Sequence, residues 1–383
     1  MAATSAPSDE RAAYGDAQDF AHTGPGTLAG RYLRTFWQPV SLSRDLAPGQ
    51  AKPLRILHED FTLYRAEDGQ PHVVAPRCAH RGTQLSTGWV EGDCIRCFYH
   101  GWKYDAAGQC VEMPAEDASF PPKVRIKSYP TEEYLGLIFA YLGEDEPPPL
   151  PRYPYYEEAA DTLVVGSRIK PYNYFNEVEN SVDPVHVAFV HRDSEFTESG
   201  LIGVPRVTAA ETEFGLEVRA ARPDGSVRVT YLEMPTVLHI KIEPPDGQAG
   251  WRDFILWRVP LDDGHFHSFF VIAPRGEAAS GRQPGRFARA SGPTEFELGD
   301  AIIAGRLRFE EIPDRTLLIS VQDYVAQRGQ GVIADREHER LGRSDAAIIL
   351  LRQLWARELR ALAAGRPLTS WRPPRRLDTT PGV

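Results

Sequence analysis

Two short loops of this sequence each offer one thiol and one imidazole at matched spacing. The first loop contains Cys78 and His80, the second contains Cys97 and His100, and sixteen residues separate the two pairs. A glycine follows each histidine within two residues, as a tight turn favours. Two thiolates on one iron and two imidazoles on the other bind a [2Fe-2S] cluster whose potential lies between about −150 and +300 mV, against about −400 mV for an all-cysteine cluster. We therefore expect such a cluster here, able to accept electrons from a ferredoxin or a flavin and pass them on.

Three other uses of the cysteines compete with the cluster. Cys94 and Cys97 have the spacing of a zinc knuckle, so a zinc site could combine them with Cys78 and Cys110. A disulfide would require an oxidising compartment, which nothing in the sequence suggests. Ordinary buried cysteines would leave both histidines unexplained. The matched spacings favour the cluster, and Cys94 and Cys110 are then buried thiols that bind no metal.

Length and composition describe an ordinary globular protein. The 383 residues are enough for two domains, and 42% of them are hydrophobic and 25% charged. A net charge of −10 without any basic run argues against binding to nucleic acid. No apolar stretch approaches the ~20 residues of a membrane span, and the first ten residues lack the features of a signal peptide. These observations predict a cytoplasmic protein.

The chain divides at an acidic, proline-dense stretch, residues 144–154, which cannot join the interior of a sheet. Before it, short β-type runs alternate with turns, and the cluster loops fall among them. After it come period-2 runs typical of an antiparallel sheet, a Gly/Arg-rich loop over 276–292, and an amphipathic helix over 345–362. The predicted parts are an N-terminal leader with a short helix (1–39), the cluster domain (40–145), a proline-rich linker (146–160), a second domain (161–362) and a C-terminal tail (363–383).

A second metal site is suggested by the segment from Asp183 to His191. Asp183 suits the N-cap of a helix and Pro184 its first position, so a helix is predicted to begin there. His186 and His191 are five residues apart, about 140° around an ideal helix, and meet one ion only if the helix is distorted or ends near His191. Two partly buried histidines on an apolar helix are the alternative. With an electron-donating cluster on the same chain, a two-histidine, one-carboxylate iron site is favoured.

The sequence resembles one family, the Rieske non-heme iron oxygenases. The resemblance is carried by Cys78–Thr83, Asp93–Asp105 and Glu179–His191, and a late segment, Arg336–Asp345, is similar to the phthalate dioxygenase branch, which also holds aryl-ether O-demethylases. It implies an α+β protein with an N-terminal all-β Rieske [2Fe-2S] domain. The C-terminal catalytic domain would be an antiparallel sheet flanked by helices, similar to a helix-grip fold, with a mononuclear Fe(II).

The resemblance also implies which carboxylates serve the iron. Asp323 matches the position of the family's acidic ligand, with Asp314 and Asp335 as rivals. Asp183 is implied to be catalytic, because the family's matching aspartate links the first iron histidine to a cluster histidine of a neighbouring subunit. Transferred to this chain, that link joins His186 to the His100 of another copy, which requires a homotrimer or a hexamer. Asn180 is a candidate to support the iron ligands, and a local backbone cap is its alternative role.

The implied function is that of a terminal oxygenase component. It would use O₂, and electrons from NAD(P)H relayed by a separate reductase or ferredoxin, since no dinucleotide-binding fingerprint is present. The substrate would be aromatic, with a carboxylate favoured, and would be hydroxylated or O-demethylated. A non-aromatic substrate, a Rieske electron carrier without oxygenase activity, and a zinc-stabilised binding module are the alternatives. Six cationic residues on or beside the predicted strands could pair with a substrate carboxylate or simply face outward: Arg206, Arg219, Arg228, Lys241, Arg252 and Arg258.

Overall fold

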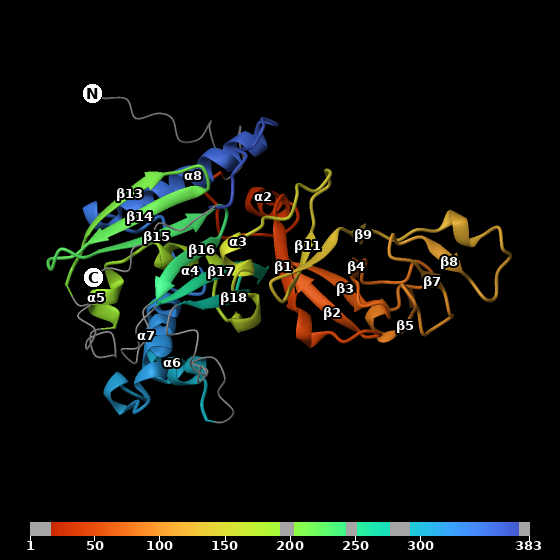
Figure 1. Cartoon of the computed structure of the whole chain (residues 1–383), viewed down its shortest axis with the longest axis horizontal. Coiled ribbons are helices and arrows are strands. Elements are labelled where there is room, and N and C mark those ends of the chain that lie inside the picture. The colour runs from red at the N-terminus through yellow and green to blue at the C-terminus, as the bar shows by residue number, and fades with distance from the viewer. Residues whose placement is uncertain (1–16, 192–202, 243–250, 276–291, 375–383) are drawn as a thin grey trace. The chain divides into compact units, whose positions relative to one another are not determined.

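A computed structural model describes residues 17–191, 203–242, 251–275 and 292–374. The chain forms two compact units (Figure 1). The first contains Thr23–Leu150 together with Val259–Asp262, and the second contains the remaining residues. The boundary at Leu150 falls within the predicted proline-rich linker. None of the described helices is long and apolar enough to cross a membrane.

The first unit is built from short antiparallel strands. Over its fully described stretch they form three sheets, with strand orders β1-β11-β10, β2-β3-β4-β9 and β5-β6-β7-β8. Its buried core lies beneath the predicted cluster loops and contains Tyr64, Ile95, Trp102 and Tyr104. The elements are α2 (Leu28–Arg34), β1 (Trp37–Leu42), β2 (Ala51–Ile56), β3 (Glu59–Arg65), β4 (Pro71–Val74), β5 (Trp89–Glu91), β6 (Cys94–Arg96), β7 (Lys103–Tyr104), β8 (Cys110–Glu112), β9 (Ser128–Tyr129), β10 (Thr131–Tyr134) and β11 (Leu137–Tyr141).

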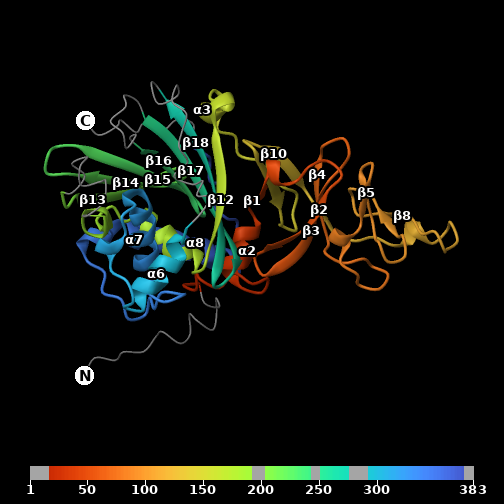
Figure 2. The same ribbon diagram turned by 90° about the horizontal axis from the view of Figure 1, so that it is seen from below.

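The second unit has one large antiparallel sheet with helices. Within the described ranges seven strands follow the order β12-β18-β17-β16-β15-β14-β13, and Figure 2 shows α6, α7 and α8 together on one side of them. Helices α4 and α5 both pack on α7. The elements are α3 (Pro154–Glu157), β12 (Val164–Lys170), α4 (Tyr174–Ser181), α5 (His186–Val190), β13 (Arg206–Glu211), β14 (Gly215–Ala221), β15 (Val227–Glu233), β16 (Val237–Ile242), β17 (Trp251–Asp262), β18 (His265–Arg275), α6 (Glu295–Ile303), α7 (Arg315–Gly329) and α8 (Ala346–Ala363).

One face of this sheet is apolar and is directed toward the helices. Leu238 pairs with Leu256 across β16 and β17, and the rings of Phe254 and Phe270 stack with their centroids 5.9 Å apart. Residues two apart on a strand share a face, so Arg258 lies on the same side as Leu256 and Phe254. The guanidinium of Arg258 donates to Ser181 Oγ of α4, which shows that this face is turned toward that helix.

The expected α+β architecture is confirmed, with a β domain followed by an antiparallel sheet with helices. The C-terminal helix predicted over 345–362 is α8, Ala346–Ala363. The loop predicted over 276–292 lies, except for its last residue, outside the described residues.

The N-terminal segment differs from the leader that the sequence suggested. Residues 17–22 belong to the second unit and α2 to the first. Phe20 is buried because its ring stacks on Phe175, with the centroids 4.9 Å apart, and its carbonyl accepts a 2.6 Å hydrogen bond from Tyr174 Oη. Phe20 therefore completes the core of the second unit, although the composition of its segment suggested a leader outside the fold.

Candidate metal centres

The two cluster loops have the same backbone geometry. The N–H groups of Cys78 and Cys97 each donate to the carbonyl five residues later, at 2.8 Å in both loops. Gly82 and Gly101 each donate back to the cysteine carbonyl at 3.0 Å, with φ values of +72° and +74°. A positive φ is costly for other residues, so the glycines allow both turns. The sequence repeat therefore produces two equivalent turns that present one cysteine and one histidine each.

The four cluster side chains occupy one region. Cys78 and Cys97 are 3% and 1% exposed, and the rings of His80 and His100 lie 4.4 Å apart between centroids. Trp102 stacks on the His80 ring at 4.5 Å. Nδ1 of His80 is buried and has no hydrogen-bond partner among the described residues. An unpartnered buried nitrogen beside two buried thiols is what a metal cluster would satisfy.

The protonation behaviour of these groups also fits metal ligands. Burial, and then the neighbouring Cys78, raise the pKa of the Cys97 thiol, so a thiolate there needs a compensating cation. Desolvation and the charges of His80 and Arg81 lower the pKa of His100, which favours the neutral imidazole that binds metals.

Tyr104 contacts the cluster loops. The sequence analysis did not single it out, although it lies within Asp93–Asp105, one of the segments that carry the resemblance. Its hydroxyl lies 3.2 Å from Cys78 Sγ and accepts the N–H of Ala79 at 3.1 Å. Hydrogen bonds to cluster sulfurs are one of the factors that set a cluster's potential.

Cys94 and Cys110 have partners outside this group. The Cys94 thiol donates to Asp93 Oδ1 at 3.2 Å, and burial followed by Asp93 raises its pKa to about 11. The Cys110 thiol donates to the Glu112 carbonyl at 3.6 Å, and burial raises its pKa as well. Each of these thiols is directed toward its own hydrogen-bond acceptor, which does not favour the zinc alternative.

Replacing Cys97→Ser should remove the visible absorption and the acid-labile sulfide of the protein, because the cluster loses a thiolate. Cys94→Ser is the matched control and should leave both unchanged, since its thiol donates to Asp93. Absorption spectra and sulfide analysis check this. Bleaching by Cys94→Ser would contradict the assignment.

The second centre brings three side chains from two segments together. His186 begins α5, His191 follows its last residue, and Asp323 lies on α7. Nε2 of His191 lies 3.1 Å and Nε2 of His186 3.9 Å from Oδ1 of Asp323. One potential ligand atom from each residue lies within 4.8 Å of the other two. The arrangement can hold a single metal ion and leave further coordination positions open.

The short length of α5 explains how two histidines five residues apart can converge. His191 lies past the helix, with φ −101° and ψ 15°, so its position does not follow the helical rotation. The predicted start at Asp183 was wrong, because the helix begins at His186 with Val185 as its N-cap residue. Asp183 instead forms a local turn, in which Oδ1 accepts the N–H of Val185 at 2.9 Å.

Hydrogen bonds aim both imidazoles at the carboxylate. Nδ1 of His186 donates to the Asp183 carbonyl, and Nδ1 of His191 donates to Gln322 Oε1 at 3.2 Å. Each Nε2 then carries a lone pair directed toward Asp323, whose Oδ1 is buried and receives no hydrogen bond in the described structure. Three electron-rich atoms that face one another are stabilised by a cation between them. Gln322 was not anticipated from the sequence, which gives no signal for it beyond adjacency to Asp323.

The pKa values favour the protonation states of metal ligands. Burial raises the pKa of Asp323, but His191 and His186 in their protonated forms outweigh burial and lower it to about 2. Desolvation lowers the pKa of His186, although Asp323 and Asp183 act in the opposite direction. A carboxylate and a neutral imidazole are thus available at neutral pH.

The other carboxylates and amides predicted for this site have local roles. Asp314 is the N-cap of α7 and accepts the N–H of Leu317 at 3.0 Å, and Asp335 pairs with His338 at 2.8 Å. The main-chain carbonyl of Asn180 accepts the N–H of Asp183 at 3.2 Å.

The six cationic candidates differ in exposure. Arg206 and Arg219 are exposed, and the ammonium of Lys241 lies over the ring of Trp251. Arg228 and Arg252 are partly buried, and Arg258 is fully buried.

Asp323 should contribute no proton competition for a metal at this centre near neutral pH. Because the pKa of Asp323 is lowered, its carboxylate is ionised above pH about 4 and adds no proton dependence between about pH 6 and 8. Asp323→Asn should therefore weaken Co(II) binding by a similar factor at both pH values, as measured by titration of metal-depleted protein. A factor that changes steeply over this range would show that Asp323 titrates there.

Comparison with known proteins agrees with a cluster in the first unit. Residues 36–130 match the Rieske [2Fe-2S] domain family. The chain is 34% identical over 365 residues to the phenoxybenzoate dioxygenase subunit alpha of Ectopseudomonas oleovorans, covering 89% of this chain and 84% of the relative. It is 30% identical over 358 residues to the 5,5'-dehydrodivanillate O-demethylase oxygenase subunit of Sphingobium sp., covering 90% and 80%.

Solved structures show the same fold. The terminal oxygenase of carbazole 1,9a-dioxygenase from Novosphingobium sp. KA1 aligns with a TM-score of 0.63 and 24% identity, over 91% of this chain and 96% of that one. The oxygenase in a reduced complex with ferredoxin in carbazole 1,9a-dioxygenase aligns with a TM-score of 0.62 and 22% identity, over 87% and 93%.

Proposed function

Since the chain belongs to the Rieske non-heme iron oxygenases, we propose that its two donor sets hold the family's two cofactors and act in one reaction. The protein is a terminal oxygenase component with a [2Fe-2S] cluster and a mononuclear iron. When bound, these cofactors supply electron transfer and reductive activation of O₂. The cluster ligands are Cys78, His80, Cys97 and His100, and the iron ligands are His186, His191 and Asp323.

The convergence of the two histidines on Asp323 is the observation that carries this function. A carboxylate and two neutral imidazoles grouped together leave positions for O₂ and for a substrate beside the metal. The hydrogen bonds from Nδ1 of each histidine hold the rings in the tautomer that a metal requires. An electron carrier without oxygenase activity would not need this second donor set.

We assign an aromatic substrate that carries a carboxylate. The apolar sheet face of β16, β17 and β18 offers Leu238, Phe254 and Phe270 to an aromatic ring. On the same face Arg258 is fully buried, and its Nε has no hydrogen-bond partner in the described structure. Its Nη1 and Nη2 donate to the Thr236 carbonyl and to Ser181 Oγ, so Nε is the donor left to meet a carboxylate. The phenoxybenzoate and phthalate dioxygenase relatives support this substrate class by their names.

The electrons are proposed to come from NAD(P)H through a separate reductase or ferredoxin. A relative's oxygenase is known in complex with a ferredoxin, and several relatives are named as oxygenase subunits of larger systems. Four described cysteines without a disulfide, and a need for NAD(P)H, fit a cytoplasmic location.

Assembly into a homotrimer, or a hexamer of two trimers, completes the proposal. His100 is exposed on the first unit, and so are Phe98 and Tyr99 beside it, at 50% and 51%. The Asp183 carboxylate is 27% exposed, and its Oδ2 lies 4.0 Å from Nδ1 of His186. An exposed ligand histidine and a partly exposed carboxylate beside the other centre would meet across a head-to-tail interface.

Turnover with phthalates, phenoxybenzoates and methoxybenzoates, supported by a generic reductase and ferredoxin, tests the function. We expect substrate-dependent O₂ consumption and a hydroxylated or O-demethylated product. His186→Ala should abolish the product and keep the Rieske spectrum and its reduction by the donor, because only the second centre loses a ligand. Intact turnover in this variant would contradict the assigned iron site.

Asp183→Asn should slow electron transfer between the centres severely while cluster and iron remain. The substitution keeps the side-chain shape but removes the charge that would hold the ring N–H of His100 from another copy, while the Asp183 carbonyl still accepts Nδ1–H of His186. Oxidation of the pre-reduced cluster in a single turnover is the quantity to follow. A normal rate in this variant, or full activity of a wild-type monomer, would show that Asp183 does not link two subunits. Its role would then be the local turn with Val185 alone.

A further inference from the structure

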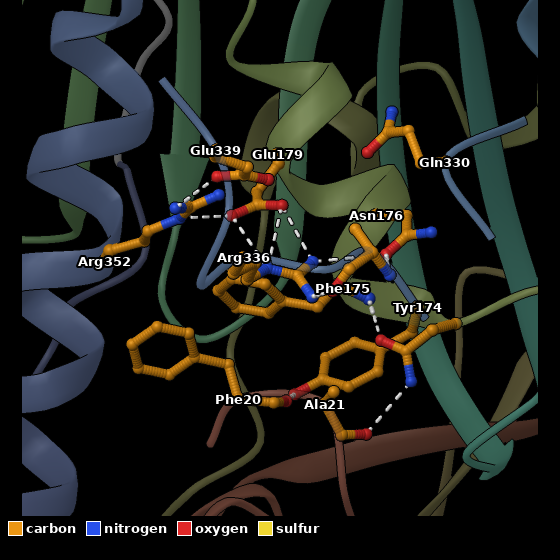
Figure 3. A network of polar contacts seen from close by, with 12 residues as sticks. Phe20, Ala21, Tyr174, Phe175, Asn176, Glu179, Gln330, Arg336, Glu339 and Arg352 are labelled. Carbon is orange, nitrogen blue, oxygen red and sulfur yellow. Dashed lines mark hydrogen bonds and ion pairs between the residues drawn. The ribbon is translucent and has the colours of Figure 1, made fainter. Parts of the chain in front are cut away.

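The late segment around Arg336 contacts the helix that leads into the histidines. Figure 3 shows the Arg336 guanidinium between Glu179 and Asn176, two side chains of α4. Its Nε lies 3.2 Å from both Glu179 oxygens, and its Nη2 lies 2.8 Å from Glu179 Oε2 and 3.2 Å from Asn176 Oδ1. The guanidinium also lies over the ring of Phe175, 5.1 Å from its centroid. One side chain thus fixes three residues of α4.

The same contacts join α4 to the end of α7. Asn176 is 1% exposed, and its Nδ2 donates to the carbonyls of Gln327 and Gly331 at 3.5 and 3.4 Å. Its Oδ1 accepts the N–H of Ala334 at 3.2 Å in addition to Arg336. Gln327 lies four residues after Asp323 on α7, so the amide of Asn176 connects the helix before His186 with the helix that carries the carboxylate.

A second arginine balances the charge of this array. Arg352 on α8 contacts Glu179 Oε1 at 2.5 Å through Nε and Glu339 Oε2 at 2.7 Å through Nη1 (Figure 3). Two guanidinium groups therefore face two carboxylates, which makes the array neutral. The Glu179 side chain is 8% exposed and that of Arg336 15% exposed, so these contacts are little screened by water.

We propose that Arg336 is a positioning residue for the iron centre, holding α4 against the end of α7 and so setting the spacing between His186 and Asp323. This inference rests on the proposed function, because it concerns the same metal site. Arg336 touches neither metal ligand nor substrate and acts through Asn176 and Glu179. Only four residues separate the end of α4 at Ser181 from His186, and nine separate it from His191, so a shift of α4 is transmitted to both histidines.

The planar guanidinium is essential to this role. It contacts two oxygens of Glu179 and one of Asn176 at once, a geometry that a lysine ammonium cannot reproduce. Removing it leaves Glu179 with Arg352 and leaves Asn176 with Gln327, Gly331 and Ala334, so α4 loses one of its ties to the end of α7 without losing every partner. We therefore expect the unit to fold and the metal geometry to loosen. Supporting residues of this kind change metal affinity by about 10- to 100-fold.

Titration of metal-depleted protein with Co(II) tests the proposal without relying on turnover. The visible bands of Co(II) report both affinity and coordination geometry. Arg336→Met should weaken binding about 10-fold or more and change the band shape, and Arg336→Lys should give a smaller loss. Arg340→Met is the matched control, because it removes the same charge from an exposed side chain of the same segment and should bind as the wild type does. The Rieske absorption should be unchanged in all three.

The outcomes separate this inference from the proposed function. If the wild type binds no Co(II), or if His186→Ala binds Co(II) as well as the wild type does, the iron site itself is wrong. If the wild type binds as expected and folded Arg336→Met binds with the same affinity and spectrum, only the positioning role is overturned. If Arg336→Met does not fold, Arg336→Lys decides, since it keeps the buried charge, and wild-type binding by that variant would overturn the proposal.

Discussion

The second unit is organised around a carboxylate that faces the unprotonated nitrogens of two imidazoles. Such a group of electron-rich atoms is unfavourable until a cation joins it, so it forms only if the surrounding structure holds the side chains in place. Asp323 comes from a fifteen-residue helix, whereas His186 and His191 come from a helix of five residues and the position after it. A five-residue helix has little stability of its own. The geometry of the centre therefore depends on what holds the segment before α5.

That segment is α4, which is anchored by two buried acids that point to different partners. Glu177 accepts from Lys170 at 2.6 Å and from the Tyr172 hydroxyl, both on the β12 side. Glu179, two residues later, meets the guanidinium groups that follow α7 and lie on α8. Residues two apart point to different sides of a helix. The eight residues of α4 are thus fixed to the sheet on one side and to the C-terminal helices on the other, and the chain that leaves Ser181 starts from a defined position.

Local patterns in the sequence were sufficient for the cluster loops and for most strands. Cys78 and Cys97 could be paired because their loops repeat the same turn. Such a turn is determined by residues close together in the sequence, including glycines that adopt positive φ. The histidine pair was identified by the same kind of local motif. Asp323 was located only by resemblance, since nothing near it distinguishes it from Asp314, which caps the same helix. Phe20, Gln322 and Arg336 act through partners more than one hundred residues away, and no spacing rule connects them.

Buried ion pairs of this kind do not have to increase stability. Removing two charges from water costs free energy that their attraction often only offsets, and well-packed apolar residues of the same size can be more stabilising. What an apolar replacement cannot provide is direction: the planar guanidinium of Arg336 meets two oxygens of Glu179 and one of Asn176 in one arrangement. A metal centre tolerates only small displacements of its ligands. A directional polar array between α4 and α7 is therefore better suited to this position than a more stabilising but less specific apolar contact.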